Sequence, residues 1–223
     1  MTLLALDTAT PSTVAGVLLD DGRVVEARDD PPAGARGRHA GRLLVLVEQA
    51  LAQAGVQWRE VDRIAVGVGP GGFTGLRIGI ATARALAQGH GLPLVPVSSL
   101  AALALGAGGP GSAAIAAVID ARRGEVFAAA WAAGRELLAP AALAPGALAE
   151  RLAELEAPVQ AVGDGAVRFR LELERAGVVV PEDGSSVHRI SAAPLCRLGS
   201  AAEPAERDRL LPDYRREPDA KPQ

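Results

Sequence analysis

Apolar runs separated by turn residues predict a chain in which strands and helices alternate. The first third holds three short apolar segments joined by tight turns, and this pattern predicts an antiparallel meander. A Pro-free stretch rich in helix formers then predicts a helix that ends at Gly55, a natural C-terminal cap. The expected elements of this part are strands over 3–6, 13–19 and 23–27, the helix 39–54, a buried strand over 63–68, a helix from about 74 to 88 with Thr74 as N-cap, a strand over 94–97 and a helix beginning near Ser98 or Ser99.

The pattern becomes weaker along the rest of the chain. After residue 177 it predicts no clear element, and residues 204–223 are expected to form a partly extended tail. Before that point the expected elements are strands over 114–119 and 125–131, a short helix over 145–155, a strand over 159–162 and a helix over 166–176.

The order of these elements suggests a fold class. Three strands followed by alternating helices and strands resemble the repeating lobe of the actin-like ATPase superfamily. We therefore expect an α/β fold with two actin-like lobes, each a mixed sheet with flanking helices. The Gly/Pro-rich stretch 106–112 is the expected boundary, which gives an N-terminal lobe over 1–106 and a C-terminal lobe with its tail over 107–223.

Composition narrows the class of protein. Of 223 residues, 49% are hydrophobic but only 3% are aromatic, so small and aliphatic side chains must fill the core and the elements must pack closely. Cys196 is the single cysteine, which excludes a disulfide framework and a cysteine-built zinc site. The chain has no apolar run long enough to span a membrane and no basic, apolar leader, so we expect a soluble, cytoplasmic protein.

The charge balance bears on nucleic-acid binding. The net charge is −3, from 26 acidic and 23 basic residues, and the arginines are scattered singly or in pairs. A protein that grips an RNA backbone by itself usually has a basic excess. An autonomous role in RNA binding is therefore disfavoured.

The strongest local pattern is the Gly-rich stretch 69–79, Gly-Pro-Gly-Gly-Phe-Thr-Gly-Leu-Arg-Ile-Gly. A Gly-rich loop at a helix N-terminus favours an anion, because free backbone N–H groups and the helix dipole point at it. The stretch is neither a Walker loop nor a dinucleotide-binding loop by its spacing. Two interpretations stay open: a phosphate site, or a tight turn from strand to helix.

The first two helices carry a second pattern. Residues 43–47 are five apolar residues in a row, which point all round a helix and leave apolar surface after one face is buried. In the next helix a smooth stripe recurs every four residues, and glycine in a helix costs about 1 kcal/mol unless packing offsets it. The stripe consists of Gly75, Gly79, Ala83 and Ala87. It seats this helix either on the first helix or on its own sheet, or else on a helix of another chain.

The stretch 69–79 resembles the Gly-Pro-Gly-Ser-Phe-Thr-Gly-Leu-Arg-Ile-Gly motif of the TsaB family, with Gly72 where serine is usual. Further similarities lie in residues 4–10, 38–40, 119–127, 162–166 and 212–216. The resemblance implies an actin-like fold and partnership with TsaD, the paralogue that transfers threonylcarbamoyl to the adenosine 3′ of the anticodon in tRNA. It implies a non-catalytic scaffold or activator, with the ATPase TsaE as a further partner and tRNA bound only through the complex.

The same resemblance bears on metal binding. TsaD holds its metal with a His-x-x-x-His pair that follows a strand ending Pro-x-x-Pro-Val, and here Ser99 and Leu103 stand at those positions. The three histidines present, His39, His90 and His188, share no ligand spacing. We expect no metal, no cofactor of its own and no catalytic residue.

The expected site residues fall into two groups. The partner-binding residues lie on the two helices, through which the family is thought to pair as a four-helix bundle: Leu43, Leu46, Val47, Ala50, Gly75, Gly79, Ala83 and Ala87. Residues near a phosphate, should a nucleotide bind at an interface shared with TsaD, are Asp7, Thr8, Gly71 and Gly72. Without TsaD, the apolar helix surface predicts a homodimer.

Two alternatives belong to other classes of protein. An independent small-molecule kinase or glycoprotease would need the phosphate motifs or metal ligands that the sequence lacks. A dimeric binding protein with no connection to tRNA stays open.

Overall fold

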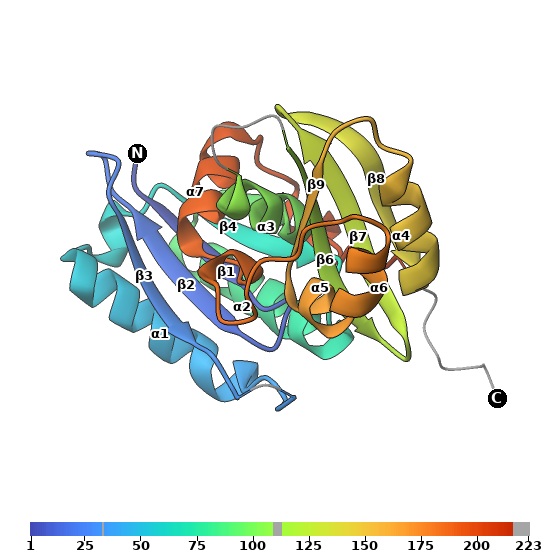
Figure 1. The fold of residues 1–223 in the computed structure, drawn as a ribbon. Coiled ribbons are helices and arrows are strands. Elements are labelled where there is room, and N and C mark those ends of the chain that lie inside the picture. The colour runs from blue at the N-terminus through green and yellow to red at the C-terminus, as the bar shows by residue number, and fades with distance from the viewer. Residues whose placement is uncertain (33, 109–112, 216–223) are drawn as a thin grey trace.

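The computed structural model describes residues 1–32, 34–108 and 113–215. They form two sheets, one of five strands in the order β3-β2-β1-β4-β5 and one of four in the order β8-β7-β6-β9 (Figure 1). The strands are β1 (Leu3–Asp7), β2 (Thr13–Leu18), β3 (Val24–Asp29), β4 (Arg63–Gly69), β5 (Leu94–Ser98), β6 (Ala114–Arg122), β7 (Glu125–Ala132), β8 (Arg135–Leu143) and β9 (Val159–Val162). The α-helices are α1 (His39–Ala54), α2 (Phe73–His90), α3 (Ser99–Ala107), α4 (Pro145–Ala153), α5 (Asp164–Arg168), α6 (Arg170–Arg175) and α7 (Ala192–Ala201). Short 3₁₀ helices span Trp58–Glu60, Ser186–His188 and Arg207–Arg209.

The elements stack in five layers. Helices α1 and α2 cover the outer face of the first sheet, and α4, α5 and α6 cover the outer face of the second. Helices α3 and α7 lie between the two sheets and share one apolar core with their inner faces (Figure 1). Small residues dominate this core, as the low aromatic content predicts. The arrangement confirms the α/β fold with two mixed sheets and flanking helices.

The predicted elements of the first 107 residues are largely confirmed. Strands β1, β2 and β3 form the antiparallel meander, and β1, β4 and β5 run parallel. Helix α1 has the predicted bounds, and Gly55 ends it in the left-handed conformation with φ 69°. The prediction of Thr74 as the N-cap of α2 is wrong. Gly72 takes that place, because its carbonyl already accepts the N–H of Leu76 at 2.9 Å and starts the helix earlier.

The second sheet departs further from the prediction. Strand β8 was not expected, since its sequence lacks alternation and contains Pro140, which an edge strand tolerates. The single helix expected over 166–176 is wrong, because Phe169, at φ −110° and ψ 30°, divides it into α5 and α6.

Helix α7 is the largest element that the sequence pattern missed. It packs on β1, β2 and β4 of the first sheet, although it follows the second sheet in the chain. Two glycines allow the close contact: a Cβ on Gly16 of β2 would lie 2.2 Å from the Cβ of Ala192, and one on Gly199 of α7 would lie 2.5 Å from the Cβ of Ala65. The division at residue 106 stays a prediction, and part of its linker, residues 109–112, lies outside the described residues.

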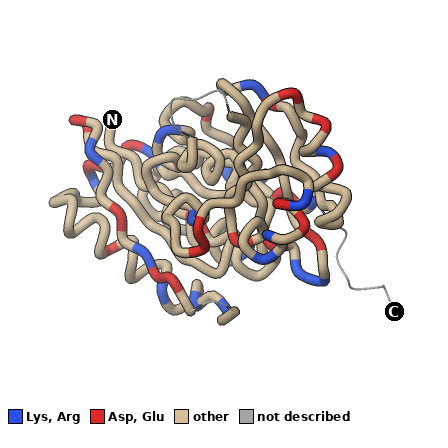
Figure 2. The backbone as a smooth tube through the Cα atoms, in the orientation of Figure 1, with Lys and Arg blue, Asp and Glu red and all other residues tan. Residues whose placement is uncertain are grey.

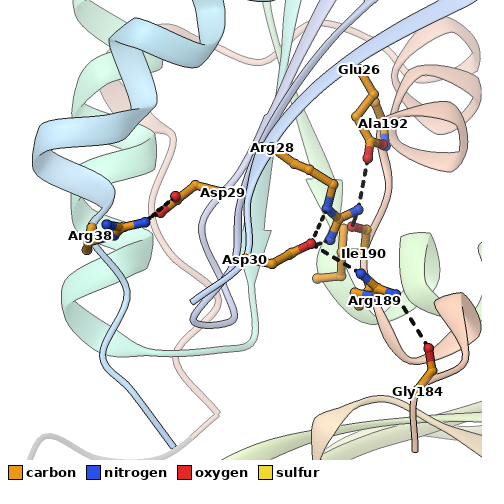
Figure 3. A network of polar contacts seen from close by, with 9 residues as sticks. All are labelled: Glu26, Arg28, Asp29, Asp30, Arg38, Gly184, Arg189, Ile190 and Ala192. Carbon is orange, nitrogen blue, oxygen red and sulfur yellow. Dashed lines mark hydrogen bonds and ion pairs between the residues drawn. The ribbon is translucent and has the colours of Figure 1, made fainter. Parts of the chain in front are cut away.

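A polar network on β3 fixes the segment that leads into α7 (Figure 3). Glu26 accepts the N–H of Ala192 at 2.6 Å and pairs with Arg28 at 2.8 Å. Arg28 in turn binds Asp30 at 2.7 Å, and Arg189 reaches the same carboxylate at 3.2 Å. The network therefore ties the chain returning from the second sheet to the edge of the first.

We expect Asp30→Asn to weaken this network in a pH-dependent way. Burial opposes ionisation of Asp30, but hydrogen bonds from Arg28, Ser12 and Arg189 outweigh it and lower the pKa of the carboxyl from 3.8 to about 2. A depressed folded-state pKa contributes stability that is present above pH 3.8 and is lost as the pH falls toward 2. After allowance for solvent screening of this partly exposed pair, the loss at pH 7 is about 1 kcal/mol.

Urea unfolding of both proteins between pH 7 and pH 3 measures this effect. The difference in unfolding free energy between the unmodified chain and Asp30→Asn should shrink below pH 4. Glu156→Gln, an exposed control, should leave stability unchanged. An equal difference at every pH would contradict the role given to the ionised carboxylate.

Candidate functional site

A cleft of about 1200 Å³ opens where elements of the two sheets meet. Residues from six separate parts of the chain line this cleft. Its lining consists of residues 8–11 after β1, 36–41 at the start of α1, 71–75 and 78 at the start of α2, 119–123 and 127 of β6 and β7, residue 164 of α5, and residues 213–215.

The Gly-rich loop forms one wall of the cleft and packs closely on Ala9, the second residue after β1. A Cβ on Gly71 would lie 2.4 Å from the carbonyl oxygen of Ala9, and the N–H of Gly72 donates to that oxygen at 2.7 Å. The tight turn from strand to helix is therefore present. Because Gly71 and Gly72 also line the cleft, phosphate binding by this loop stays a prediction.

The glycine stripe of α2 seats that helix on its own sheet. A Cβ on Gly75 would lie 2.1 Å from the carbonyl oxygen of Thr8, and one on Gly79 would lie 2.2 Å from the Thr8 hydroxyl. That hydroxyl donates to the carbonyl of Gly75 at 2.8 Å in a buried position. Helix α2 can approach β1 this closely only because both positions lack a side chain.

Asp7 lies behind the cleft and is not among the residues that line it. Its carboxylate accepts the Ser99 hydroxyl at 2.6 Å and the N–H of Ala9 at 2.8 Å, and it is 1% exposed. Burial outweighs both hydrogen bonds and raises the pKa of Asp7 to about 6. Of the two residues expected near a phosphate at the end of β1, the structure brings only Thr8 to the cleft.

His39 anchors the start of α1 at the cleft. Its Nδ1 lies 2.8 Å from the hydroxyl of Thr13 on β2, and burial lowers the pKa of its imidazole. Beside it Arg38 binds Asp29 at the end of β3 with two nitrogens, at 2.5 and 3.2 Å. These contacts connect α1 to the meander.

The opposite wall carries two carboxylates that are engaged within the chain. Asp164 of α5 accepts the backbone N–H of Asp120 at 3.0 Å, and burial raises the pKa of its carboxyl. Asp120 binds Arg168 at 2.9 Å and Arg122 at 3.1 Å.

All eight residues predicted to bind a partner are buried within this single chain. Their exposed fractions are 0–1% for Leu43, Leu46, Val47, Ala50, Ala83 and Ala87, and Gly75 and Gly79 are buried as well. They pack α1 and α2 on the first sheet and on one another. Partner binding by the two helices stays a prediction, and the side chains available for it are the exposed neighbours of these residues.

The exposed side of α1 and α2 carries an apolar face that residue-by-residue prediction missed. Leu44 is 53% exposed and Val45 is 43% exposed. Helix α2 adds exposed Ala81 and Ala85 beside half-buried Ile78. We call Leu44, Val45, Ala81 and Ala85 the helix face, while Ile78 lines the cleft. Its signal in the sequence was the unbroken apolar run 43–47, of which the sheet covers Leu43, Leu46 and Val47.

The C-terminal segment runs along α2 to the cleft. Leu210 is buried against the first sheet, and the N–H of Asp213 donates to Val68 of β4 at 2.8 Å. Tyr214 then packs on Phe73, with ring centres 5.3 Å apart, and its hydroxyl accepts Arg77 at 2.9 Å. The expected extended tail is present as far as residue 215, and residues 216–223 lie outside the described residues.

The residues that could have bound a metal, Ser99, Leu103 and the histidines, do not come together in one site. Ser99 is bonded to Asp7 and to the N–H of Gly69, and Leu103 lies in the core between the sheets. His90 stacks on Trp58, while His188 accepts the N–H of Gly163. Within residues 1–32, 34–108 and 113–215, no group of three or more His, Cys, Asp or Glu gathers as metal ligands would. None of the helices described there is long and apolar enough to cross a membrane.

Comparisons with known proteins point to one family. The family model described as TsaD, tRNA N6-adenosine threonylcarbamoyltransferase, matches residues 31–168. An uncharacterised protein of Mycobacterium tuberculosis is 36% identical over 99% of this chain and 94% of its own length. The tRNA threonylcarbamoyladenosine biosynthesis protein TsaB of Escherichia coli is 40% identical over 59% of this chain and 54% of its own length.

Solved structures point to the same family. YeaZ from Pseudomonas aeruginosa superposes with a TM-score of 0.77 at 34% identity, covering 96% of this chain and 99% of that one. The ethanolamine utilization protein EutJ from Carboxydothermus hydrogenoformans has a TM-score of 0.53 at 17% identity, covering 89% and 90% of the two chains. At that identity the likeness shows the fold alone, which is the actin-like fold expected from the order of elements.

We expect Asp7→Asn to stabilise the protein at neutral pH. A folded-state pKa of about 6, above the ordinary 3.8, means that stability is greatest below pH 3.8 and is lost as the pH rises to 6. Asparagine keeps an acceptor for Ala9 and carries no charge to desolvate. The gain at pH 7.5 should be about 1–3 kcal/mol.

Thermal unfolding at pH 4 and pH 7.5 tests this, with Glu182→Gln as a control for loss of an exposed carboxylate. The variant should melt higher than the unmodified chain only at the higher pH. A lower melting temperature at pH 7.5 would show that the ionised carboxylate holds the loop in place.

Proposed function

This chain belongs to the TsaB/YeaZ family, and from that premise we propose that it is a non-catalytic scaffold or activator subunit in the synthesis of threonylcarbamoyladenosine in tRNA. In this role it binds a TsaD-type transferase, which carries the catalytic site and modifies the adenosine 3′ of the anticodon. The chain itself supplies a surface rather than a reacting group.

The observation that carries the proposal is the helix face. Leu44 and Val45 of α1 expose about half of their side chains, and the adjacent helix α2 exposes the small residues Ala81 and Ala85. Small residues let a second helix approach closely, and the two larger ones supply apolar area to bury. Apolar side chains exposed on two adjacent helices are typical of a protein interface.

The nature of the partner follows from the likeness to TsaD. The transferase family model matches residues 31–168, which include both α1 and α2. A paralogue of the same fold would present an equivalent pair of helices. Two such pairs related by a pseudo-two-fold axis form a four-helix bundle.

The contacts of the acidic residues support a non-catalytic role. Asp7 is held behind the cleft by Ser99 and Ala9, and Asp120 is held by two arginines. Carboxylates bound in this way are engaged in holding the fold. The proposed assembly also includes a TsaE-type ATPase and takes tRNA only as a complex, in the cytoplasm, with any nucleotide held at the interface shared with TsaD.

We expect Val45→Glu to prevent binding of the transferase. The carboxylate would be buried without a partner in the bundle, which should weaken binding at least a hundredfold. Ala153→Glu on α4 introduces the same charge on the far side of the molecule and should bind normally. The measurement is a pull-down of the same organism's TsaD homologue, followed by isothermal titration.

Reconstitution with unmodified tRNA and threonylcarbamoyl-adenylate then tests the role itself. Mixtures of the TsaD and TsaE homologues should form product only with this chain present, and Val45→Glu should fail to restore it. The chain alone should show no transfer, kinase or peptidase activity. Product formation in its absence would refute the proposed function.

Self-association provides a separate prediction. Without the transferase, a second copy is expected to cover the helix face, so the unmodified chain should be a dimer in light scattering. Val45→Glu should be a folded monomer, because the residue is exposed and its change leaves the core intact. A monomeric unmodified chain at micromolar concentration would argue against the helix face as an interface.

A further inference from the structure

We propose that the mouth of the cleft is a docking surface for single-stranded RNA, with one unstacked base on the Phe73–Tyr214 pair and adjacent phosphates on arginines of the cleft walls. The RNA is the loop of the tRNA substrate, presented within the complex. The proposal rests on the proposed function, which places a tRNA next to this chain.

The charge around the cleft is opposite in sign to that of the whole protein. The lining contains five arginines and three aspartates, whereas the complete chain has a net charge of −3. Basic and acidic positions are otherwise distributed over both halves of the molecule (Figure 2). The arginines come from distant parts of the sequence and are Arg36, Arg38, Arg122, Arg123 and Arg215. Three of them are ion-paired within the chain: Arg38 with Asp29, Arg122 with Asp120 and Arg215 with Asp213. The lining as a whole keeps an excess of two positive charges, which no segment of the sequence displays.

Two of these arginines occupy a costly backbone conformation. Arg122 ends β6, and Arg123 and Gly124 form the turn to β7. The two arginines have φ 64° and 55°, in the left-handed region. Hairpin turns of this kind favour Asn and Gly, because a larger side chain is disfavoured there. Unfavourable backbone conformations of this sort concentrate at functional sites. Here the turn holds guanidinium groups at the rim of the cleft.

An aromatic platform lies at the same rim. Phe73 and Tyr214 are 44% and 42% exposed, and their rings stack at 5.3 Å with 29° between the planes. The guanidinium of Arg77 lies 3.9 Å from the centre of the Phe73 ring. Proteins that bind single strands without sequence preference combine exposed aromatic rings with a positive groove in this way.

The position of the platform favours a polymer over a free nucleotide. A mononucleotide would place its phosphate at the Gly-rich loop, but there Gly71 packs on Ala9, and the Thr8 hydroxyl is used by Gly75. The rings and the arginines line more than one wall of the same cleft, so a strand can pass from one wall to the other. The cleft therefore fits a chain of phosphates with a splayed base.

The test uses the complex of this chain with its TsaD-type partner and measures affinity for unmodified tRNA at several salt concentrations. Arg36→Gln combined with Arg123→Asn should weaken binding about tenfold and reduce the salt slope by about 1.4, for two lost phosphate contacts on a single strand. Asparagine suits the left-handed conformation at residue 123. Phe73→Leu should weaken binding roughly tenfold with an unchanged salt slope, because stacking does not release counterions.

Arg59→Gln is the matched control. Arg59 follows the far end of α1, a helix of 16 residues, and so lies roughly 24 Å along its axis from the cleft. This variant should bind tRNA normally. All variants should still capture the partner, and loss of capture by the cleft variants would overturn the proposal by placing the partner on the cleft.

Crosslinking within the same complex offers a second measurement, which does not depend on affinity. A tRNA anticodon stem-loop carrying 4-thiouridine in its loop should crosslink to the peptide containing Phe73 or Tyr214, and the Arg36/Arg123 double variant should crosslink several-fold less. ATP at millimolar concentration should not compete. Unchanged tRNA affinity in all cleft variants, or loss of the crosslink with ATP alone, would refute RNA docking while leaving partner capture, and with it the proposed function, intact.

Discussion

The close approach of α2 to the end of β1 is the contact on which the rest of the structure depends. Thr8 meets the helix where Gly75 and Gly79 have no side chain, and its hydroxyl bonds to the helix backbone. The approach fixes the start of α2, and so places residues 71–75 along the cleft. It also buries the small-residue stripe within the chain, because the side of α2 that lies on β1 cannot face another protein. Whatever the helix offers to a partner must come from its opposite side.

Much of the first half could be predicted because its signals are local. The apolar runs, the Gly55 cap and the turn at residue 22 each depend on neighbouring residues, and the bounds of α1 follow from them. Helix α7 escaped prediction because its stability comes from contacts distant in sequence, such as Ala192 against Gly16. The pairing of Phe73 with Tyr214 is equally non-local. In the candidate site the loop 69–79 was recognisable, but which side of α2 is buried depends on Thr8, and no helical pattern contains that information.

The difference between local and non-local signals also explains why the arginines of the cleft could not be predicted as a group. Net charge and spacing along the chain gave no basic cluster, because Arg36, Arg123 and Arg215 are widely separated in sequence. Topology brings them to one cleft, where β1, α1, α2 and the β6–β7 turn meet the C-terminal segment. Average charge decides solubility and long-range attraction, whereas recognition depends on where the fold gathers the charges. A weakly acidic chain can therefore carry a basic site.

Helix α2 takes part in both proposed surfaces. Its first turn, at Phe73, lines the cleft, and Ala81 and Ala85 belong to the helix face about two to three turns further on. A single rigid helix seated on β1 by two glycines holds these surfaces at a fixed spacing. The segment ending at Tyr214 packs along the same helix, with Asp208 near Arg84 and Tyr214 on Arg77, and so supports that spacing from the side. A subunit that orients a partner relative to an RNA needs this rigidity more than it needs a reacting group.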